Sequence, residues 1–215
     1  MPPAPNPPPH PAFVRWTHWI TALAFAALLV SGVEILISHP RFYWGETGNV
    51  DTPALFQLPI PSSRPDVKTG YGYVLPDQNG WSRSLHFQSA WAVVFTGAAY
   101  LGLGLLRGHF SRRLWPARPP HGPTAYNTLQ RLAYLSVICA LFPFLIWTGL
   151  AMAPGLTAAY PILVTSLGGH QSARTLHFFA AIALALFAVA HVFMVYRAGF
   201  LPRVRAMITG QQEEV

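Results

Sequence analysis

The chain has 215 residues, of which 52% are hydrophobic and only 10% are charged. Soluble globular domains carry about 25% charged residues, so this composition excludes an ordinary soluble domain and places the chain in a lipid bilayer. The formal net charge of +7 does not indicate a nucleic-acid partner, because the basic residues follow a membrane topology and do not gather on one amphipathic face.

Four apolar segments are long enough to cross about 30 Å of hydrocarbon as helices. We therefore predict an all-α integral membrane protein, a four-transmembrane-helix bundle that occupies residues 13–200. A Pro-rich tail (residues 1–12) precedes it as a disordered segment, and a cytoplasmic tail (residues 201–215) follows it. The predicted spans are residues 13–38, 84–107, 126–152 and 171–197.

Arginines indicate which side of the membrane holds the chain ends. They precede the first span, fill the connection between the second and third spans, and follow the last span, and by the positive-inside rule they mark the cytoplasmic side. Both termini are then predicted to be cytoplasmic. These arginines are Arg15, Arg107, Arg112, Arg113, Arg118, Arg197, Arg203 and Arg205.

The long connection between the first two spans, residues 39–83, is then an outer loop. It is rich in Pro, Gly and aromatic residues, which favours an ordered outer cap that forms either a docking surface or an aromatic belt at the membrane interface. The shorter connection of residues 153–170 predicts an interfacial or re-entrant helix on the same side.

His177 and His191 lie fourteen residues apart in the last apolar segment. On an α-helix this interval returns to within roughly 40° of the same face and separates the rings by about 21 Å. One helix face can therefore supply a ligand to each of two stacked cofactors. Two further histidines, His18 and His86, lie near the starts of the first and second segments.

Helix direction assigns a depth to each of these four histidines. The first helix runs outward and the second and fourth run inward, so depth pairs His18 with His191 on the cytoplasmic side. It pairs His86 with His177 on the outer side, and no other arrangement gives two level pairs. Two imidazoles from different helices at equal depth can hold a haem iron between them, so the four histidines are predicted metal ligands for two haems.

A single intramembrane histidine is more often a hydrogen-bonded interior residue or part of a proton relay, and the level pairs are what favour iron. The third span has no histidine and is interpreted as a packing wall, and Cys139 within it as a core residue. The remaining histidines are interpreted as solvated. They are His10, His39, His109, His121 and His170.

Three arginines lie one turn before predicted ligands, namely Arg15, Arg83 and Arg174. Each is a candidate cofactor-binding residue for a haem propionate, because the guanidinium fork suits carboxylates. The alternative is that these arginines only snorkel at the interface. Glu34, near the outer end of the first span, either handles protons at a quinol site or simply lies at the interface.

The segments Val14-Arg-Trp-Thr-His-Trp19, Leu85-His-Phe87 and Ser172-Ala-Arg-Thr-Leu-His177, with His191 beyond, resemble the bacterial cytochrome b561 and Ni,Fe-hydrogenase-type cytochrome b family. The resemblance covers all four spans. It implies a multi-pass protein of the bacterial cytoplasmic (inner) membrane. It also implies two haem b groups with bis-histidine iron, and electron transport in a respiratory chain that involves a quinone. The long first loop looks most like members that accompany a periplasmic molybdopterin oxidoreductase.

The leading hypothesis is a diheme b-type cytochrome that carries electrons between the quinone pool and an outer-side (periplasmic) redox partner, as the membrane subunit of an oxidoreductase. With both axial positions filled, iron favours outer-sphere electron transfer. Two alternatives stay open: a superoxide:quinone oxidoreductase, and a haem-free proton-coupled transporter. The sequence also leaves open the direction of electron flow and whether the chain forms a homodimer.

Overall fold

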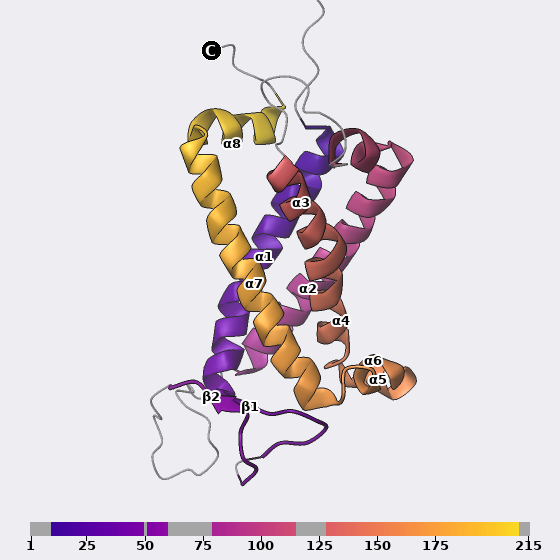
Figure 1. Ribbon diagram of the computed structural model, residues 1–215, viewed down its shortest axis with the longest axis vertical. Coiled ribbons are helices and arrows are strands. Elements are labelled where there is room, and N and C mark those ends of the chain that lie inside the picture. Colours follow the sequence, from indigo (N-terminus) through magenta and orange to yellow (C-terminus); the bar gives the residue numbers. More distant parts are fainter. Residues whose placement is uncertain (1–9, 50, 60–78, 115–127, 211–215) are drawn as a thin grey trace, which may run out of the picture.

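The computed structural model describes residues 10–49, 51–59, 79–114 and 128–210, and these are mostly helical (Figure 1). The tail before residue 10, residues 60–78 of the long loop, His121 and residues 211–215 lie outside the described residues. The elements in chain order are α1 (Ala12–Ser38), β1 (Arg41–Phe42), β2 (Phe56–Gln57), α2 (Asn79–Leu106), η1 (Phe110–Leu114), α3 (Thr128–Ser136), η2 (Val137–Leu141), α4 (Phe142–Leu150), α5 (Pro154–Ala159), α6 (Ile162–Thr165), α7 (His170–Arg197) and α8 (Phe200–Thr209).

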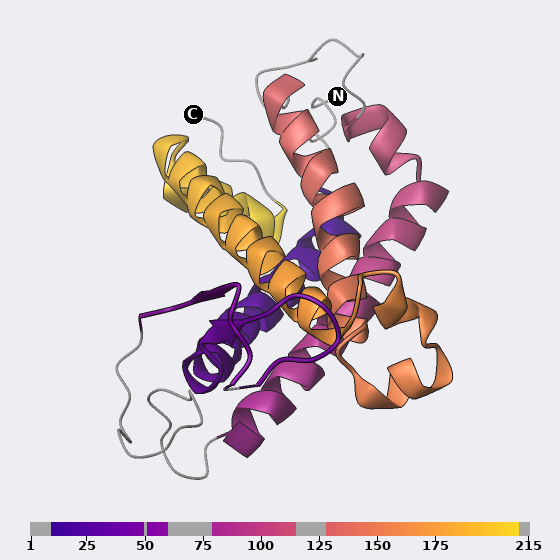
Figure 2. The ribbon, with the colours of Figure 1, turned by 60° about the horizontal axis from the view of Figure 1, so that its bottom comes forward.

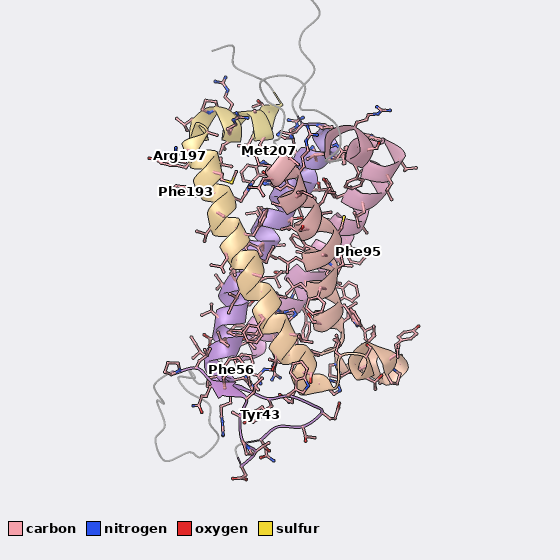
Figure 3. The ribbon with its side chains drawn as sticks, viewed as in Figure 1. Tyr43, Phe56, Phe95, Phe193, Arg197 and Met207 are labelled. Carbon is pink, nitrogen blue, oxygen red and sulfur yellow. The ribbon has the colours of Figure 1, made fainter. Side chains whose placement is uncertain are left out.

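Four helical segments are long and apolar enough to cross a membrane, which confirms the predicted fold class. They are α1, α2, the continuous run of α3, η2 and α4, and α7. Apart from its end turns, each helix satisfies its own backbone hydrogen bonds, as a segment surrounded by hydrocarbon must. Large apolar side chains face outward: Phe95 is 67% exposed and Phe193 is 58% exposed, on the outside of the bundle (Figure 3).

The bundle consists of two helix pairs. Helix α1 packs chiefly against α2, and α7 packs chiefly against α4. The short elements divide between the two ends of the bundle, since β1, β2, α5 and α6 lie at one end and α8 crosses the other (Figures 1 and 2). We refer to these as the loop end and the α8 end.

The third span is not a regular α-helix throughout. Its middle, Val137–Leu141, is wound as a π-helix, and Pro143 follows in the first turn of α4. Proline has no backbone N–H and its ring clashes with the carbonyl four residues earlier, here that of Cys139, which explains the wider turn. Cys139 itself is exposed on the outside of the helix, so its interpretation as a core residue was wrong.

Other boundaries also differ from the sequence prediction. Helix α2 begins at Asn79, five residues before the predicted span. The connection after the third span holds two short helices, α5 and α6, in place of one. Helix α8 was not expected at all; it begins after Gly199, whose φ of +96° ends α7 and turns the chain across the bundle.

Candidate functional site

The structure brings the four intramembrane histidines together as two pairs. The His18 ring on α1 lies 6.2 Å from the His191 ring on α7, measured between ring centroids, with 55° between the planes. The His86 ring on α2 lies 6.3 Å from the His177 ring on α7, with 63° between the planes. These are the pairs that depth predicted, and both connect the α1–α2 pair of helices to α7.

The two pairs lie at opposite ends of one helix. His177 begins the third turn of α7 at the loop end, and His191 is near its last turn at the α8 end. With a rise of about 1.5 Å per residue, the fourteen residues between them separate the pairs by about 21 Å along the axis. We call His86 and His177 the loop-end pair, and His18 and His191 the α8-end pair.

Buried hydroxyl groups contact the loop-end pair. The Oγ atom of Ser31 on α1 lies 3.0 Å from Nδ1 of His86, and Oγ1 of Thr148 on α4 lies 2.9 Å from Nδ1 of His177. The Ser31 and Thr148 side chains are completely buried. The third span is therefore more than the expected packing wall, because Thr148 hydrogen-bonds a residue of the predicted ligand set.

Aromatic rings surround the α8-end pair. The Phe187 ring stacks on His191 at 5.9 Å with 18° between the planes, and the Tyr134 ring meets the same imidazole edge-on at 6.2 Å. Trp19 lies edge-on to His18 at 5.2 Å. Nδ1 of His18 is buried and has no hydrogen-bond partner among the described residues. The two pairs thus have different surroundings, polar at the loop end and aromatic at the α8 end.

The long loop holds the start of α7, and hence His177, in place. The carbonyl of Gly45 accepts hydrogen bonds from the N–H groups of Gln171 (3.0 Å) and Ser172 (3.2 Å). A carboxylate oxygen of Glu46 accepts one from the N–H of His170 at 3.2 Å. These are first-turn donors that a helix cannot satisfy internally. The loop caps α7 from outside, since the residue before the helix, Gly169, offers no side chain.

A small aromatic stack joins the same loop to α7. Phe42 is 2% exposed; its ring stacks on Phe56 at 4.5 Å and packs against Phe178 at 4.4 Å. The two-residue strands β1 and β2 place Phe42 opposite Phe56. The hydroxyl of Thr175 donates to the carbonyl of Tyr43 at 2.7 Å. In its described part, the loop is an ordered cap at the end of the bundle, and Tyr43 and Phe56 are labelled there in Figure 3.

Two of the three candidate propionate arginines already bond backbone carbonyls. Arg15 donates to the carbonyl of Ile208 at 2.8 Å, at the end of α8. Arg174 donates to the carbonyls of Arg41, at 3.0 Å, and His39, and its guanidinium lies over the Phe42 ring. Arg83 is exposed. Arg15 and Arg174 would therefore share their donors between these carbonyls and a propionate.

The histidines outside the two pairs have varied environments. His109 is only 9% exposed and its ring lies edge-on to Phe13, Tyr100 and Phe110, so its interpretation as solvated was wrong. His39, just beyond α1, is half-buried. Burial, followed by the charge of Arg174, lowers the pKa of His39. His10 is also half-buried, and His170 faces the Glu46 carboxylate at 3.5 Å.

One further sequence candidate is Glu34. Glu34 lies in the last turns of α1 at the loop end and is half-buried. Among the described residues, no group of three or more His, Cys, Asp or Glu side chains converges on a point that could hold a metal ion. A metal at either pair would therefore take two imidazoles from the protein, and a haem supplies the remaining ligands of its iron.

Sequence reasoning missed Ser31 and Thr148 as contributors to the site. A serine or threonine inside a span usually bonds the carbonyl one turn earlier in its own helix, and both residues do so. The sequence signal was weak but present. Each is followed by glycine, and the Cβ that an alanine would add at Gly32 or Gly149 would lie 3.6 or 3.4 Å from Cε1 of His86 or His177.

Membrane-length helices that bring histidines together in pairs at two depths define a class, that of the multi-pass membrane cytochromes. The family profile described as prokaryotic cytochrome b561 matches residues 9–210, and the chain belongs to this family. The protein is accordingly a multi-pass inner-membrane protein that binds haem b and serves as an electron-transfer subunit.

A relative from Azospira oryzae supports the same assignment. It carries the name "Putative protein-methionine-sulfoxide reductase subunit YedZ1". It is 28% identical over 218 residues, which cover 94% of this chain and 96% of the relative. No solved structure matches the chain significantly.

Proposed function

We propose that this chain is a two-haem b-type cytochrome that carries electrons across the inner membrane between the quinone pool and a redox partner on the periplasmic side. The observation that carries the proposal is the presence of two imidazole pairs, one at each end of α7, with ring centroids 6.2 and 6.3 Å apart. Each pair is assigned one haem, with His18 and His191 as ligands of one iron and His86 and His177 of the other.

The pair spacing fits a bis-histidine iron. A metal–imidazole bond of about 2.0 Å on each side of one ion places the two ring centres about 6 Å apart. At the loop end, the Nδ1 atoms of His86 and His177 are engaged by hydroxyls, so the Nε2 atoms are the ones available to iron. The haem, when bound, supplies the one-electron chemistry, and the protein supplies axial ligands, orientation and a water-poor surrounding.

The orientation of the chain follows from its charges. The α8 end carries Arg107, Arg197 and Arg203, and the helices α7 and α8 contain no Asp or Glu, whereas the loop end also carries Glu46 and Asp51. The positive-inside rule then places the α8 end in the cytoplasm, with both termini, and the loop end in the periplasm. Electrons would thus cross the membrane along α7, between the α8-end pair and the loop-end pair.

The ordered loop cap is the surface that we assign to the periplasmic partner. The relative from Azospira oryzae is named as a subunit of a protein-methionine-sulfoxide reductase. We propose a catalytic subunit of that kind, which reduces oxidised methionine in proteins, as the partner. We also propose that this partner holds a molybdopterin cofactor, because the long first loop resembles that of family members which accompany a periplasmic molybdopterin oxidoreductase. Arg83, near the same end, is proposed for a haem propionate.

The test uses the full chain purified in detergent. We expect two haems per polypeptide and two one-electron steps in a redox titration. Replacing His18 or His191 by alanine removes one haem, and replacing His86 or His177 removes the other. The control is His109→Leu, a buried histidine outside both pairs, which retains both haems.

Three results would contradict the proposal. A correctly assembled but colourless preparation excludes haem and favours a transporter. Loss of one common centre from His18→Ala and His86→Ala excludes the pairing. Rapid consumption of superoxide with added quinone, in the absence of any partner, favours the superoxide:quinone oxidoreductase.

A further inference from the structure

Two buried hydroxyls in different spans make the same contact with the two histidines of the loop-end pair. Ser31 on α1 lies 3.0 Å from Nδ1 of His86 on α2, and Thr148 on α4 lies 2.9 Å from Nδ1 of His177 on α7. The hydroxyl in each case comes from the helix that packs against the histidine's own helix. Each helix pair therefore carries one imidazole that it orients by itself.

The direction of these hydrogen bonds follows from the number of protons available. A hydroxyl has one proton to donate. Ser31 lies 2.7 Å from the carbonyl of Ala27, and Thr148 lies 3.0 Å from the carbonyl of Phe144, and carbonyl oxygens can only accept. With its proton donated to the carbonyl, each hydroxyl oxygen accepts a hydrogen bond from the imidazole N–H at Nδ1. The Nε2 atom then keeps its lone pair.

The residues next to the hydroxyls complete two similar cradles. Gly32 follows Ser31, and a Cβ added to it would lie 3.6 Å from Cε1 of His86. Gly149 follows Thr148, and a Cβ added to it would lie 3.4 Å from Cε1 of His177. The imidazoles therefore lie directly on the helix surface, held at Nδ1 by the hydroxyl. A serine or threonine followed by glycine thus provides both the hydroxyl and the space for an imidazole, once in α1 and once in α4.

The α8-end pair is held differently. Nδ1 of His18 is buried without a hydrogen-bond partner among the described residues, and the rings around that pair are those of Trp19, Phe187 and Tyr134. A hydrogen bond from Nδ1–H to an oxygen makes the imidazole a more electron-rich ligand at Nε2. The two ends of α7 thus present ligands of unequal basicity.

We propose that Ser31 and Thr148 are positioning residues of the loop-end centre, which fix the tautomer and orientation of His86 and His177 and stabilise the oxidised form of the iron between them. This inference rests on the proposed function, since it assumes that the loop-end pair binds a haem. Its consequence is a loop-end haem that is harder to reduce than it would be without the two hydroxyls. The α8-end haem receives no such contribution at His18.

The experiment compares Ser31→Ala and Thr148→Val with the wild-type chain, each purified with its haems. We expect both variants to shift the midpoint potential of the loop-end haem to more positive values. At a fixed potential, the ratio of reduced to oxidised loop-end haem should rise by about three- to tenfold, and haem retention should weaken by about tenfold. The α8-end haem keeps its potential. Low-spin ferric EPR signals of the loop-end haem change as well, because the imidazole orientation is no longer fixed.

Matched variants separate positioning from general destabilisation. Thr148→Ser keeps the hydroxyl and restores the wild-type potential. Thr96→Val removes a hydroxyl on α2 whose partners in the described part of the chain are carbonyls of its own helix, those of Ala92 and Val93. This variant leaves both potentials unchanged.

The inference is overturned if wild-type and both hydroxyl-free variants share the same loop-end potential and EPR signals, or if Thr96→Val shifts that potential equally. It is also overturned if Thr148→Ser behaves like Thr148→Val. These outcomes are distinct from failure of the proposed function, in which the wild-type chain itself carries no haem at the loop-end pair.

Discussion

Each end of the bundle holds two imidazoles close together, with ring centroids 6.2 Å apart at the α8 end and 6.3 Å apart at the loop end, but the contacts that hold them differ. At the loop end, hydroxyls bond the imidazole nitrogens and an outside loop caps α7. At the α8 end, aromatic rings surround the imidazoles, and α1 reaches α8 through Arg15 and Trp19, which donate to the carbonyls of Ile208 and Met207. Hydrogen bonds fix the orientation of the imidazoles at the loop end, whereas packing of aromatic rings surrounds the imidazoles at the α8 end.

This difference indicates that the positions and orientations of the imidazoles are more tightly restricted at the loop end than at the α8 end. A hydrogen bond restricts both the position and the tautomer of an imidazole, while stacked rings restrict mainly its plane. The apolar cluster of fully or nearly fully buried residues is also at the loop end, where Ala151, Val164, Leu167 and Ala173 join α4, α6 and α7. Damage to the loop end should therefore cost more stability than equivalent damage to the α8 end.

Gly169→Ala has the largest expected effect and tests this ranking. Gly169 has a φ of +113°, and an added Cβ would lie 2.5 Å from the carbonyl carbon and oxygen of Gly45. The strained backbone costs about 1–3 kcal/mol, and the displaced cap on α7 adds about 1–3 kcal/mol through overpacking. Thermal unfolding in detergent should show a clearly lower midpoint, and the loop-end haem should be lost before the α8-end haem.

Two glycines give the matched controls. Gly199 at the α8 end has a φ of +96° but open space around its Cβ position, so Gly199→Ala includes the strain without the clash. Gly155 in α5 has open space and no such φ, and Gly155→Ala should be nearly neutral. If Gly169→Ala were no more destabilising than Gly199→Ala, the capping of α7 by Gly45 would carry little weight.

The sequence predicted the spans and the depth of each histidine, and it did so for a physical reason. A segment surrounded by hydrocarbon must be apolar and helical, so length and composition alone indicate it. The direction of each helix follows from the alternation of spans, and with it the pairing of histidines by level. The spans and the histidine depths can therefore be predicted from the composition, length and order of the individual segments, without knowledge of the contacts between them.

What the sequence did not reveal depends on contacts between distant segments. Neither Thr148 nor Ser31 shows in its own helix that it faces a histidine of another, and the cap on α7 joins Gly45 to residues more than 120 positions later. His109 was interpreted as solvated because it lies in the connection after the predicted span of residues 84–107, yet it packs among aromatic rings. To predict such contacts one must know how each helix is rotated about its own axis, and composition does not give this rotation.

Exchanging arginine for lysine at each end has an intermediate expected effect. Arg174 bonds the carbonyls of Arg41 and His39 from two separate nitrogens, and Arg174→Lys replaces these by a single ammonium nitrogen, so we expect one of the two bonds to be lost. Losing one charge-assisted hydrogen bond costs about 1.5–3 kcal/mol. Hydrogen exchange should quicken at the amides of Leu55 and Leu58, which bond the carbonyls of Phe42 and Pro40 in the same loop.

The matching exchange at the α8 end is Arg15→Lys. The bond from Arg15 to the carbonyl of Ile208 is exposed, so its loss should cost less than about 1 kcal/mol. The amide of Gly210, which bonds the carbonyl of Ala206 at the end of α8, reports on it by hydrogen exchange. An Arg15 variant as damaging as the Arg174 variant would contradict the ranking of the two ends.

The smallest expected effect is a dependence of loop-end stability on pH. Burial and the nearby charges of Arg174 and Arg83 lower the pKa of His39, against the opposing effect of its bond to the carbonyl of Ile35. In the unfolded chain His39 takes up a proton below about pH 6.5, whereas in the folded chain it stays neutral to lower pH. The unfolded state then binds more protons, so the free energy of unfolding falls as the pH drops below about 6.5. In thermal unfolding followed from pH 7 to pH 5, His39→Gln should therefore lose less stability than the wild-type chain. An identical pH profile for the two would show that His39 contributes nothing to the acid sensitivity of the loop end, and would leave the hydroxyl contacts and the α7 cap as the features that distinguish this end from the other.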